Sequence, residues 1–191
     1  NKAEKGGSLY VSNADYIITV KTKFVNNKAD LTGGSTHIAT TKSITSASVT
    51  FFRNHAKNGG AIFLSHSDVA LNYNVSFLSN FCEKEGGGVY ALHVQFVYNT
   101  HCLCKTNKAL SSGGNYISKS VIFKNEKYLF VLNEALEGSV FVSDKIKTVV
   151  NVECSFLINK AINNGGVMFL SQIQKAINYM CQFYQNIGLE R

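Results

Sequence analysis

The chain has 191 residues, of which 45% are hydrophobic, so it is long and apolar enough to form one domain with a sizeable core. No stretch reaches the roughly 18 consecutive apolar residues that a membrane helix needs, so no membrane insertion is expected in this segment. The formal net charge is +7, but the lysines are scattered, and this pattern favours a solvated surface over a nucleic-acid partner.

A repeat with a period of 26 or 27 residues runs through the chain from its first residue. Its main marker is Phe-x-x-Asn, with phenylalanines Phe24, Phe51, Phe77, Phe130, Phe156 and Phe183, and with Cys104 in the remaining place. The asparagines of the marker are Asn27, Asn54, Asn80, Asn107, Asn133, Asn159 and Asn186. A small residue follows two positions after each Asn, and a glycine pair such as Gly6-Gly7 or Gly59-Gly60 comes next.

Short strands are predicted between these markers, in the same order in every unit. An apolar or aromatic pair such as Leu9-Tyr10 follows most glycine pairs, although Ser35-Thr36-His37 interrupts this pattern in the second unit. Residues 61–64 and 75–78 have the alternation that is typical of half-buried strands, and the glycine pairs and Asn are turn residues. In the sixth unit, Glu137 stands where the first glycine is expected.

These features together predict an all-β fold, a right-handed parallel β-helix of about seven coils that covers residues 1–191 as one segment. One coil cannot bury its apolar face alone, whereas stacked coils can. We expect the phenylalanines to stack inward and the asparagines to form a ladder of amide hydrogen bonds between coils. The right hand is taken from the general rule for parallel crossovers and does not follow from the repeat itself.

The repeat starts and stops in the middle of a unit, and open coil ends expose unpaired strand backbone. We therefore expect this segment to be a fragment of a longer repeat protein, with further coils or capping elements of the same chain on both sides.

Two motifs of the repeat resemble those of chlamydial polymorphic outer membrane proteins. Residues 51–54 (Phe-Phe-Arg-Asn) with residues 59–62 (Gly-Gly-Ala-Ile) match best, and residues 77–80 with 86–89 match in degenerate form. The resemblance implies a right-handed parallel β-helix, surface exposure and a role in adhesion, and it supplies no catalytic residues. Similar repeats occur in large surface proteins of protists, so such a homologue is a further expectation.

No catalytic, cofactor or metal site is predicted. Parallel β-helices that cleave acidic polysaccharides need clustered carboxylates, but Asp30 and Glu83 lie two coils apart with Lys57 between them, as on a solvated edge. No two histidines are expected to share a column, so a metal set is not expected; they are His37, His55, His66, His93 and His101.

The five cysteines have irregular spacing, which is not a disulfide framework. Cys102 and Cys104 occupy inward positions and are interpreted as core thiols. Cys154 and Cys181 lie at equivalent positions one coil apart, where free thiols are favoured over a stacked disulfide. Asn74, in the sequon Asn74-Val75-Ser76, is expected to face outward and is a candidate glycosylation site.

The sequence favours a non-enzymatic segment of a surface or extracellular protein that acts as a stalk, filament component or adhesin. Its partners would be other filament or surface proteins, or glycans. Two alternatives stay open: a polysaccharide-active β-helix enzyme with its active coils elsewhere, and an intracellular scaffold in a large assembly.

Overall fold

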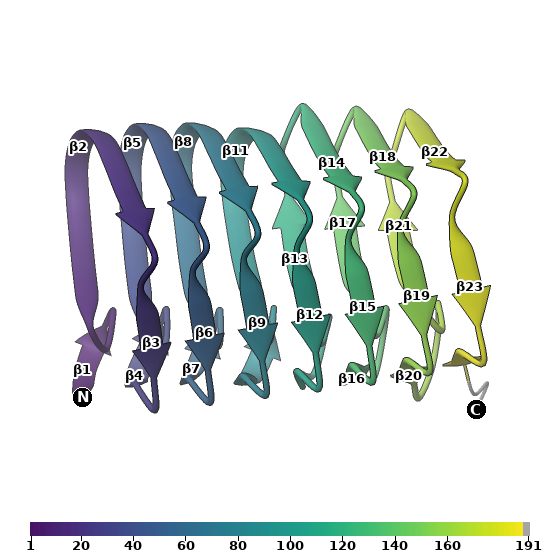
Figure 1. Cartoon of the computed structure of the whole chain (residues 1–191), viewed down its shortest axis with the longest axis horizontal. Coiled ribbons are helices and arrows are strands. Elements are labelled where there is room, and N and C mark those ends of the chain that lie inside the picture. The colour runs from purple at the N-terminus through teal and green to yellow at the C-terminus, as the bar shows by residue number, and fades with distance from the viewer. Residues whose placement is uncertain (189–191) are drawn as a thin grey trace.

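The computed structural model describes residues 1–188, and these residues form only strands and turns. The strands build about seven parallel coils, each of which contributes to three sheets. In Figure 1 the chain advances from left to right while it descends in front and rises behind, so the coils wind in the right-handed sense. The predicted right-handed parallel β-helix is thus confirmed.

Sheet A follows each marker Asn, and its strands have two to five residues. It contains β1 (Lys2–Lys5), β4 (Lys28–Thr32), β7 (His55–Asn58), β10 (Phe81–Glu85), β16 (Glu134–Ala135), β20 (Lys160–Ala161) and β24 (Ile187–Gly188). In the fifth coil the sheet is reduced to isolated bridges at Lys108 and Ser111. Sheet A is therefore less regular in the middle of the stack.

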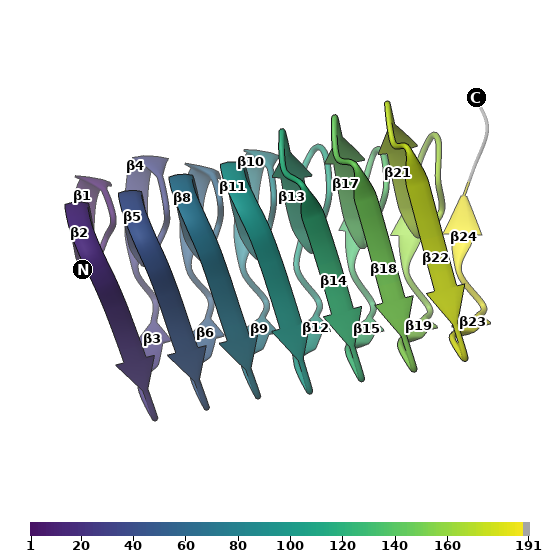
Figure 2. The same ribbon diagram turned by 90° about the horizontal axis from the view of Figure 1, so that it is seen from above.

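Sheet B is the longest side of each coil. Its continuous strands are β2 (Leu9–Val20), β5 (Thr36–Ala47), β8 (Ile62–Tyr73) and β11 (Val89–Thr100). Later coils divide the strand into β13 (Asn115–Ser118) with β14 (Ile122–Glu126), β17 (Phe141–Asp144) with β18 (Thr148–Val152), and β21 (Met168–Ser171) with β22 (Lys175–Tyr179). Figure 2 shows these strands side by side as one layer along the whole stack.

Sheet C carries the phenylalanine of each marker. Its strands are β3 (Lys23–Val25), β6 (Thr50–Phe52), β9 (Ser76–Leu78), β12 (Leu103–Lys105), β15 (Leu129–Val131), β19 (Ser155–Leu157) and β23 (Gln182–Tyr184). Equivalent residues pair without a shift, so Phe51 lies between Phe24 and Phe77. This register is what makes each sequence marker a physical column.

Each coil turns at residues in the left-handed backbone region. In the third coil these are Gly59, His66, Asn74 and Ser79, with φ of 64°, 50°, 51° and 52°. Left-handed φ costs most residues about 1–2 kcal/mol, and glycine tolerates it best. The second glycine of the pair has a different role, because a Cβ on Gly60 would run into the carbonyl oxygen of Gly87 in the next coil.

The predicted glycine register is wrong in the fifth and sixth coils. Ser112 (φ 59°) takes the first glycine position of the fifth coil, and Gly138 (φ 50°) takes that of the sixth. Glu137 therefore lies one residue before that corner and pairs with Ser111 of the preceding coil. A register predicted from the glycine pairs alone is wrong here, because each corner is defined by the left-handed φ of its residue and not by the residue type.

Candidate binding surfaces

The inner columns explain why the coils stack, and they leave the outer faces available for binding. The Nδ2 of Asn80 donates to Oδ1 of Asn107 at 3.0 Å and to the carbonyl oxygen of Phe51 at 3.0 Å. Its Oδ1 accepts from the Nδ2 of Asn54 at 3.0 Å and from the backbone N–H of Asn54 at 2.9 Å. The same pattern links the predicted asparagines from Asn27 to Asn186.

The phenylalanines form two inward stacks on either side of Cys104. Ring centroids are 5.0 Å apart for Phe24 and Phe51, and 5.2 Å for Phe51 and Phe77. Beyond Cys104 the second stack contains Phe130, Phe156 and Phe183, at 5.1 Å and 4.7 Å. The structure thus places all six predicted phenylalanines in one column, with a gap at one coil.

A second asparagine ladder escaped the sequence analysis. Nδ2-to-Oδ1 hydrogen bonds of 2.8–2.9 Å connect Asn72, Asn99, Asn125, Asn151 and Asn178 on the inner side of sheet B. Each of these residues lies five positions before the Phe or Cys of the marker in its own coil. That constant offset was the signal that could have identified the ladder.

An aromatic column lies on the outer side of sheet B. It contains Tyr10, His37, Phe63, Tyr90 and Tyr116, with neighbouring centroids 4.7–5.3 Å apart. His37, which interrupts the sequence pattern, continues this column as a flat ring. Burial, followed by the charge of Lys5, lowers the pKa of His37 to about 4, so its ring is neutral near pH 7.

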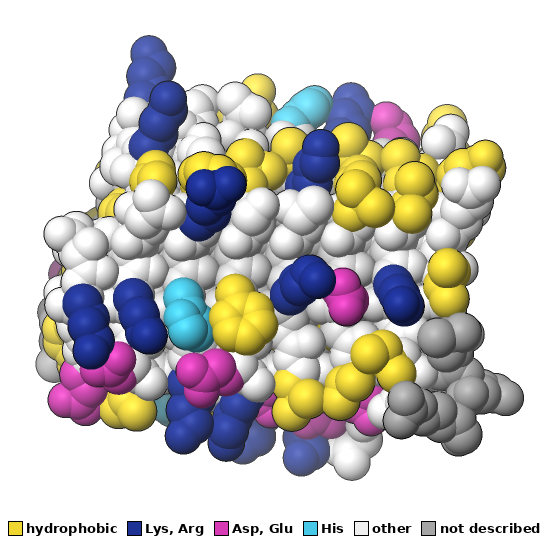
Figure 3. All heavy atoms as spheres, turned by 90° about the horizontal axis from the view of Figure 1, so that it is seen from below, with side chains coloured by type: hydrophobic (Ala, Val, Ile, Leu, Met, Phe, Trp, Pro, Cys, Tyr) yellow, Lys and Arg dark blue, Asp and Glu magenta, His cyan; other side chains and the backbone are white. Residues whose placement is uncertain are grey.

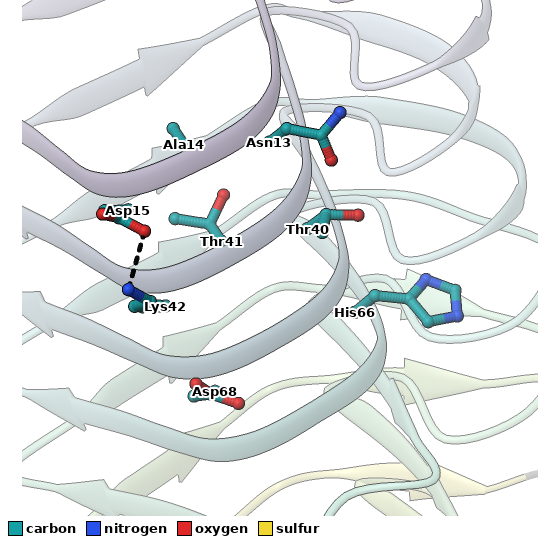
Figure 4. A pocket seen from close by; sticks show the side chains of 8 residues that line it. All are labelled: Asn13, Ala14, Asp15, Thr40, Thr41, Lys42, His66 and Asp68. Atoms are coloured by element: carbon teal, nitrogen blue, oxygen red, sulfur yellow. Dashed lines mark ion pairs between the residues drawn. The ribbon is translucent and has the colours of Figure 1, made fainter.

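A polar hollow of about 370 Å³ lies beside the bend of sheet B in the first three coils. Figure 4 shows Asp15 and Lys42 pointing toward each other, with 2.9 Å between the carboxylate oxygen and Nζ. Asp68, further along, accepts a 2.9 Å hydrogen bond from Gln95. Asp15 and Lys42 neutralise each other, and Asp68 is bonded to an uncharged amide, so the hollow offers hydrogen bonds and one net negative charge.

His66 lies at the edge of this hollow. Its position shows that the prediction of no two histidines in one column is wrong. Its ring stacks on His93 of the next coil with 4.9 Å between centroids, so two histidines do share a column. The residue offset between them is a full period, which the sequence analysis overlooked. Within residues 1–188, no group of three or more His, Cys, Asp or Glu side chains is arranged to hold a metal ion.

All five cysteines are free, and four are buried. Burial raises the pKa of Cys82 and Cys154 to about 12 and that of Cys102 to about 11. Cys104 replaces a phenylalanine in the core, and its Sγ accepts a hydrogen bond from Nδ2 of Asn107 at 3.2 Å. Thiols with raised pKa are poor nucleophiles at neutral pH, which is consistent with a packing role.

The predicted glycosylation residue lies on the surface. Asn74 is exposed at the corner between sheets B and C, and its Nδ2 donates to Oγ of Ser48 at 3.2 Å. Val75, the next residue, is fully buried. The side chain that would accept a glycan therefore points away from the core.

The outer side of sheet A carries rows of charged side chains, which Figure 3 shows together with apolar ones. Lys108 pairs with Glu134 at 2.8 Å, and His55 lies 3.5 Å from Glu83. Asp30 pairs with Lys2 at 3.7 Å, so it faces a lysine. Phe81 and Leu136 line a largely apolar groove of about 320 Å³ on the same side.

Comparison with known families identifies one segment. Residues 48–65 match the model of the Chlamydia polymorphic membrane protein repeat, and they contain both Phe51–Asn54 and the Gly-Gly-Ala-Ile motif that begins at Gly59. The chain is similar to polymorphic membrane protein repeats. The predicted resemblance is confirmed by this match and by the parallel solenoid. No curated protein and no solved structure matches the chain.

The polymorphic membrane protein repeat family points to the cell surface or the outer membrane. In residues 1–188 no helix is long and apolar enough to cross a membrane. The matched segment contains Phe51 of the second coil and Asn54 and Gly59 of the third, so the family's motif coincides with residues of the columns that stack the coils.

Proposed function

We propose that this chain is a non-enzymatic segment of a surface or extracellular solenoid, and that it acts as a stalk, a filament component or an adhesin. The observation that carries this proposal is the polymorphic membrane protein repeat at residues 48–65, placed within a stack of like coils. Because internal ladders repeat at every coil, such a stack is stiff and extends by adding coils.

The side chains support a binding role more than a catalytic one. Exposed carboxylates such as Asp15 and Glu134 are paired with lysines, and the buried thiols have raised pKa values. The outer aromatic column from Tyr10 to Tyr116 offers a linear surface with tyrosine hydroxyls, which suits an extended partner such as a glycan or another surface protein. Asn74 would carry the glycan if the chain is made in a eukaryotic secretory pathway.

Protease treatment of intact source cells, followed by mass spectrometry of the released peptides, tests the location. Release of peptides from this chain before lysis is expected for a surface solenoid. Protection until lysis would remove the surface proposal and favour an intracellular scaffold.

Beads coated with the purified chain test adhesion separately. We expect them to bind host or neighbouring cells, and Tyr90→Ala to reduce this binding because it interrupts the outer column. Lys108→Ala, on sheet A, is the matched surface control. Surface release without bead binding would keep the stalk role and reject the adhesin.

A further inference from the structure

The outer side of the second half of sheet B is mostly apolar, with polar outward side chains in the second coil (Ser43 and Thr45) and charged ones in the fifth (Lys124 and Glu126). This patch, hereafter the outer patch, consists of the outward residues of β14, β18 and β22 and of the C-terminal halves of β2, β5, β8 and β11. Tyr16 is 71% exposed and Ile18 is 72% exposed in the first coil. Leu71 and Tyr73 in the third coil are 38% and 55% exposed.

Water-facing sheets normally alternate between apolar and polar residues, whereas strands that are covered on both faces read as near-continuous apolar runs. Residues 16–20 read Tyr-Ile-Ile-Thr-Val, and residues 148–152 read Thr-Val-Val-Asn-Val. The inward residues Ile17, Val149 and Asn151 of these segments already pack in the core or in the second asparagine ladder. The first and sixth coils therefore have the pattern of a sheet with a second layer on its outer side.

Within residues 1–188 no element covers the outer patch, and Figure 2 looks directly onto its strands. Its charged residues are Lys124, Glu126 and Lys175, and the first two pair with each other at 2.9 Å. Phe96 and Tyr98 lie at its centre with parallel rings. The patch is thus close to neutral, although the chain carries a net charge of +7.

We propose that the outer patch is an interface at which two copies of this chain pack face to face. Two molecules with the same positive charge repel each other, so a contact between copies is favoured where the surface is uncharged. A basic or acidic partner would instead require complementary charges on the patch.

The size of the patch agrees with a dimer. With about 4.8 Å between coils and about 3.3 Å between residues, it covers roughly 34 Å by 17 Å. Two such faces would bury roughly 1,200 Å² in total, which exceeds the roughly 1,000 Å² expected of a specific interface. Flat sheets pack about 10 Å apart with interdigitating side chains, so residues such as Leu71 and Tyr98 would lie between the two layers.

Sedimentation equilibrium of the 191-residue chain over a range of concentrations tests the proposal. The wild-type chain is expected to reach a dimer and not to associate further. The double substitution Leu71→Lys and Tyr98→Lys places two charges on the patch and is expected to raise the dimer Kd by roughly a hundredfold. The circular dichroism spectrum of this variant should match wild type, and so should its Tm at concentrations where the wild-type chain is monomeric, because both residues point outward.

Leu129→Lys provides the matched control. Leu129 lies on the outer side of sheet C and is 37% exposed, nearly the same as Leu71. The control should leave the dimer intact. A wild-type chain that stays monomeric would overturn the proposal, and so would a Leu129→Lys chain whose dimer is weakened as much as that of the double variant. Open-ended association that ignores the patch substitutions would also overturn it, because it would indicate end-to-end stacking of coils.

Discussion

At the scale of single residues, the strongest constraints are buried amides that serve two coils at once. The Asn80 side chain accepts two hydrogen bonds from Asn54 and donates two others, and its residue is 1% exposed. Removing such an amide leaves polar groups of both neighbouring coils unpaired in the core. The cost falls on these partners more than on the residue itself.

Asn80→Ala should therefore lower the free energy of unfolding by about 2–4 kcal/mol, because two or more buried partners lose their hydrogen bonds. Asn74→Ala is the control at an exposed corner, and it should change stability by less than about 1 kcal/mol. Urea unfolding followed by circular dichroism measures both values. Equal losses for the two variants would refute the ladder as a source of stability.

His37 makes stability depend on pH. Its pKa is about 4 in the folded chain, below the ordinary value of 6.5, because the ring is buried and lies near Lys5. Between pH 6.5 and 4 the unfolded state binds more protons, so stability falls as pH falls through this window. The loss at pH 4 should be at most about 3 kcal/mol.

His37→Phe should flatten this pH dependence and preserve the outer column, since Phe63 occupies the equivalent place in the next coil. Urea midpoints at several pH values between 4 and 7 would show the effect. The same substitution at exposed His101 should leave the slope in place. If His37→Phe keeps the full slope, the dependence arises from other groups.

At the scale of the columns, the gap at Cys104 is filled from a neighbouring column. Tyr128 is fully buried and stacks on Phe130 with 3.9 Å between centroids. Phe156 covers Phe130 in register at 5.1 Å from the other side, so the Tyr128 ring lies on the side that faces Cys104. A large ring in one column thus compensates for a small side chain in the other.

Cys104→Phe alone should destabilise the chain by about 1–3 kcal/mol, because the new ring and Tyr128 compete for one space. Tyr128→Val should also destabilise, since it leaves a cavity. The double variant has a Phe at position 104 and a Val at position 128, the same two residue types as Phe77 and Val75 in the third coil. Its free energy of unfolding should exceed the value obtained by adding the effects of the two single substitutions. A double-mutant cycle with additive effects would contradict this account.

These columns also show how far the sequence could predict the structure. The period and the residue types gave the coils and the Phe and Asn columns, because stacking requires equivalent residues to repeat. The outer aromatic column varies between Tyr, His and Phe, so no single residue type marked it, whereas His66 and His93 are one full period apart and could have been identified from the repeat. The corner at Ser112 was missed because left-handed φ depends on backbone register, which the glycine pairs identify only in part.

At the scale of the whole molecule, stability should depend on how many neighbours a coil has. In a solenoid, each coil gains stability from its own contacts and from the interfaces with adjacent coils. Phe77 has covered faces on both sides and is 0% exposed, whereas Phe183, in the last described coil, is 49% exposed. Two phenylalanines of the same column thus differ in how much of their surface is buried.

Phe77→Leu should lower the free energy of unfolding of the 191-residue chain by about 1–3 kcal/mol, because it loses buried area and leaves a gap in a packed core. Phe183→Leu loses less buried area, so its cost should be smaller by about 1 kcal/mol or more. Hydrogen exchange with mass spectrometry gives a second measurement, in which Phe183→Leu should loosen only the last coil. If the two substitutions cost the same, the coils do not derive their stability from their neighbours, and the stack would unfold as one indivisible unit.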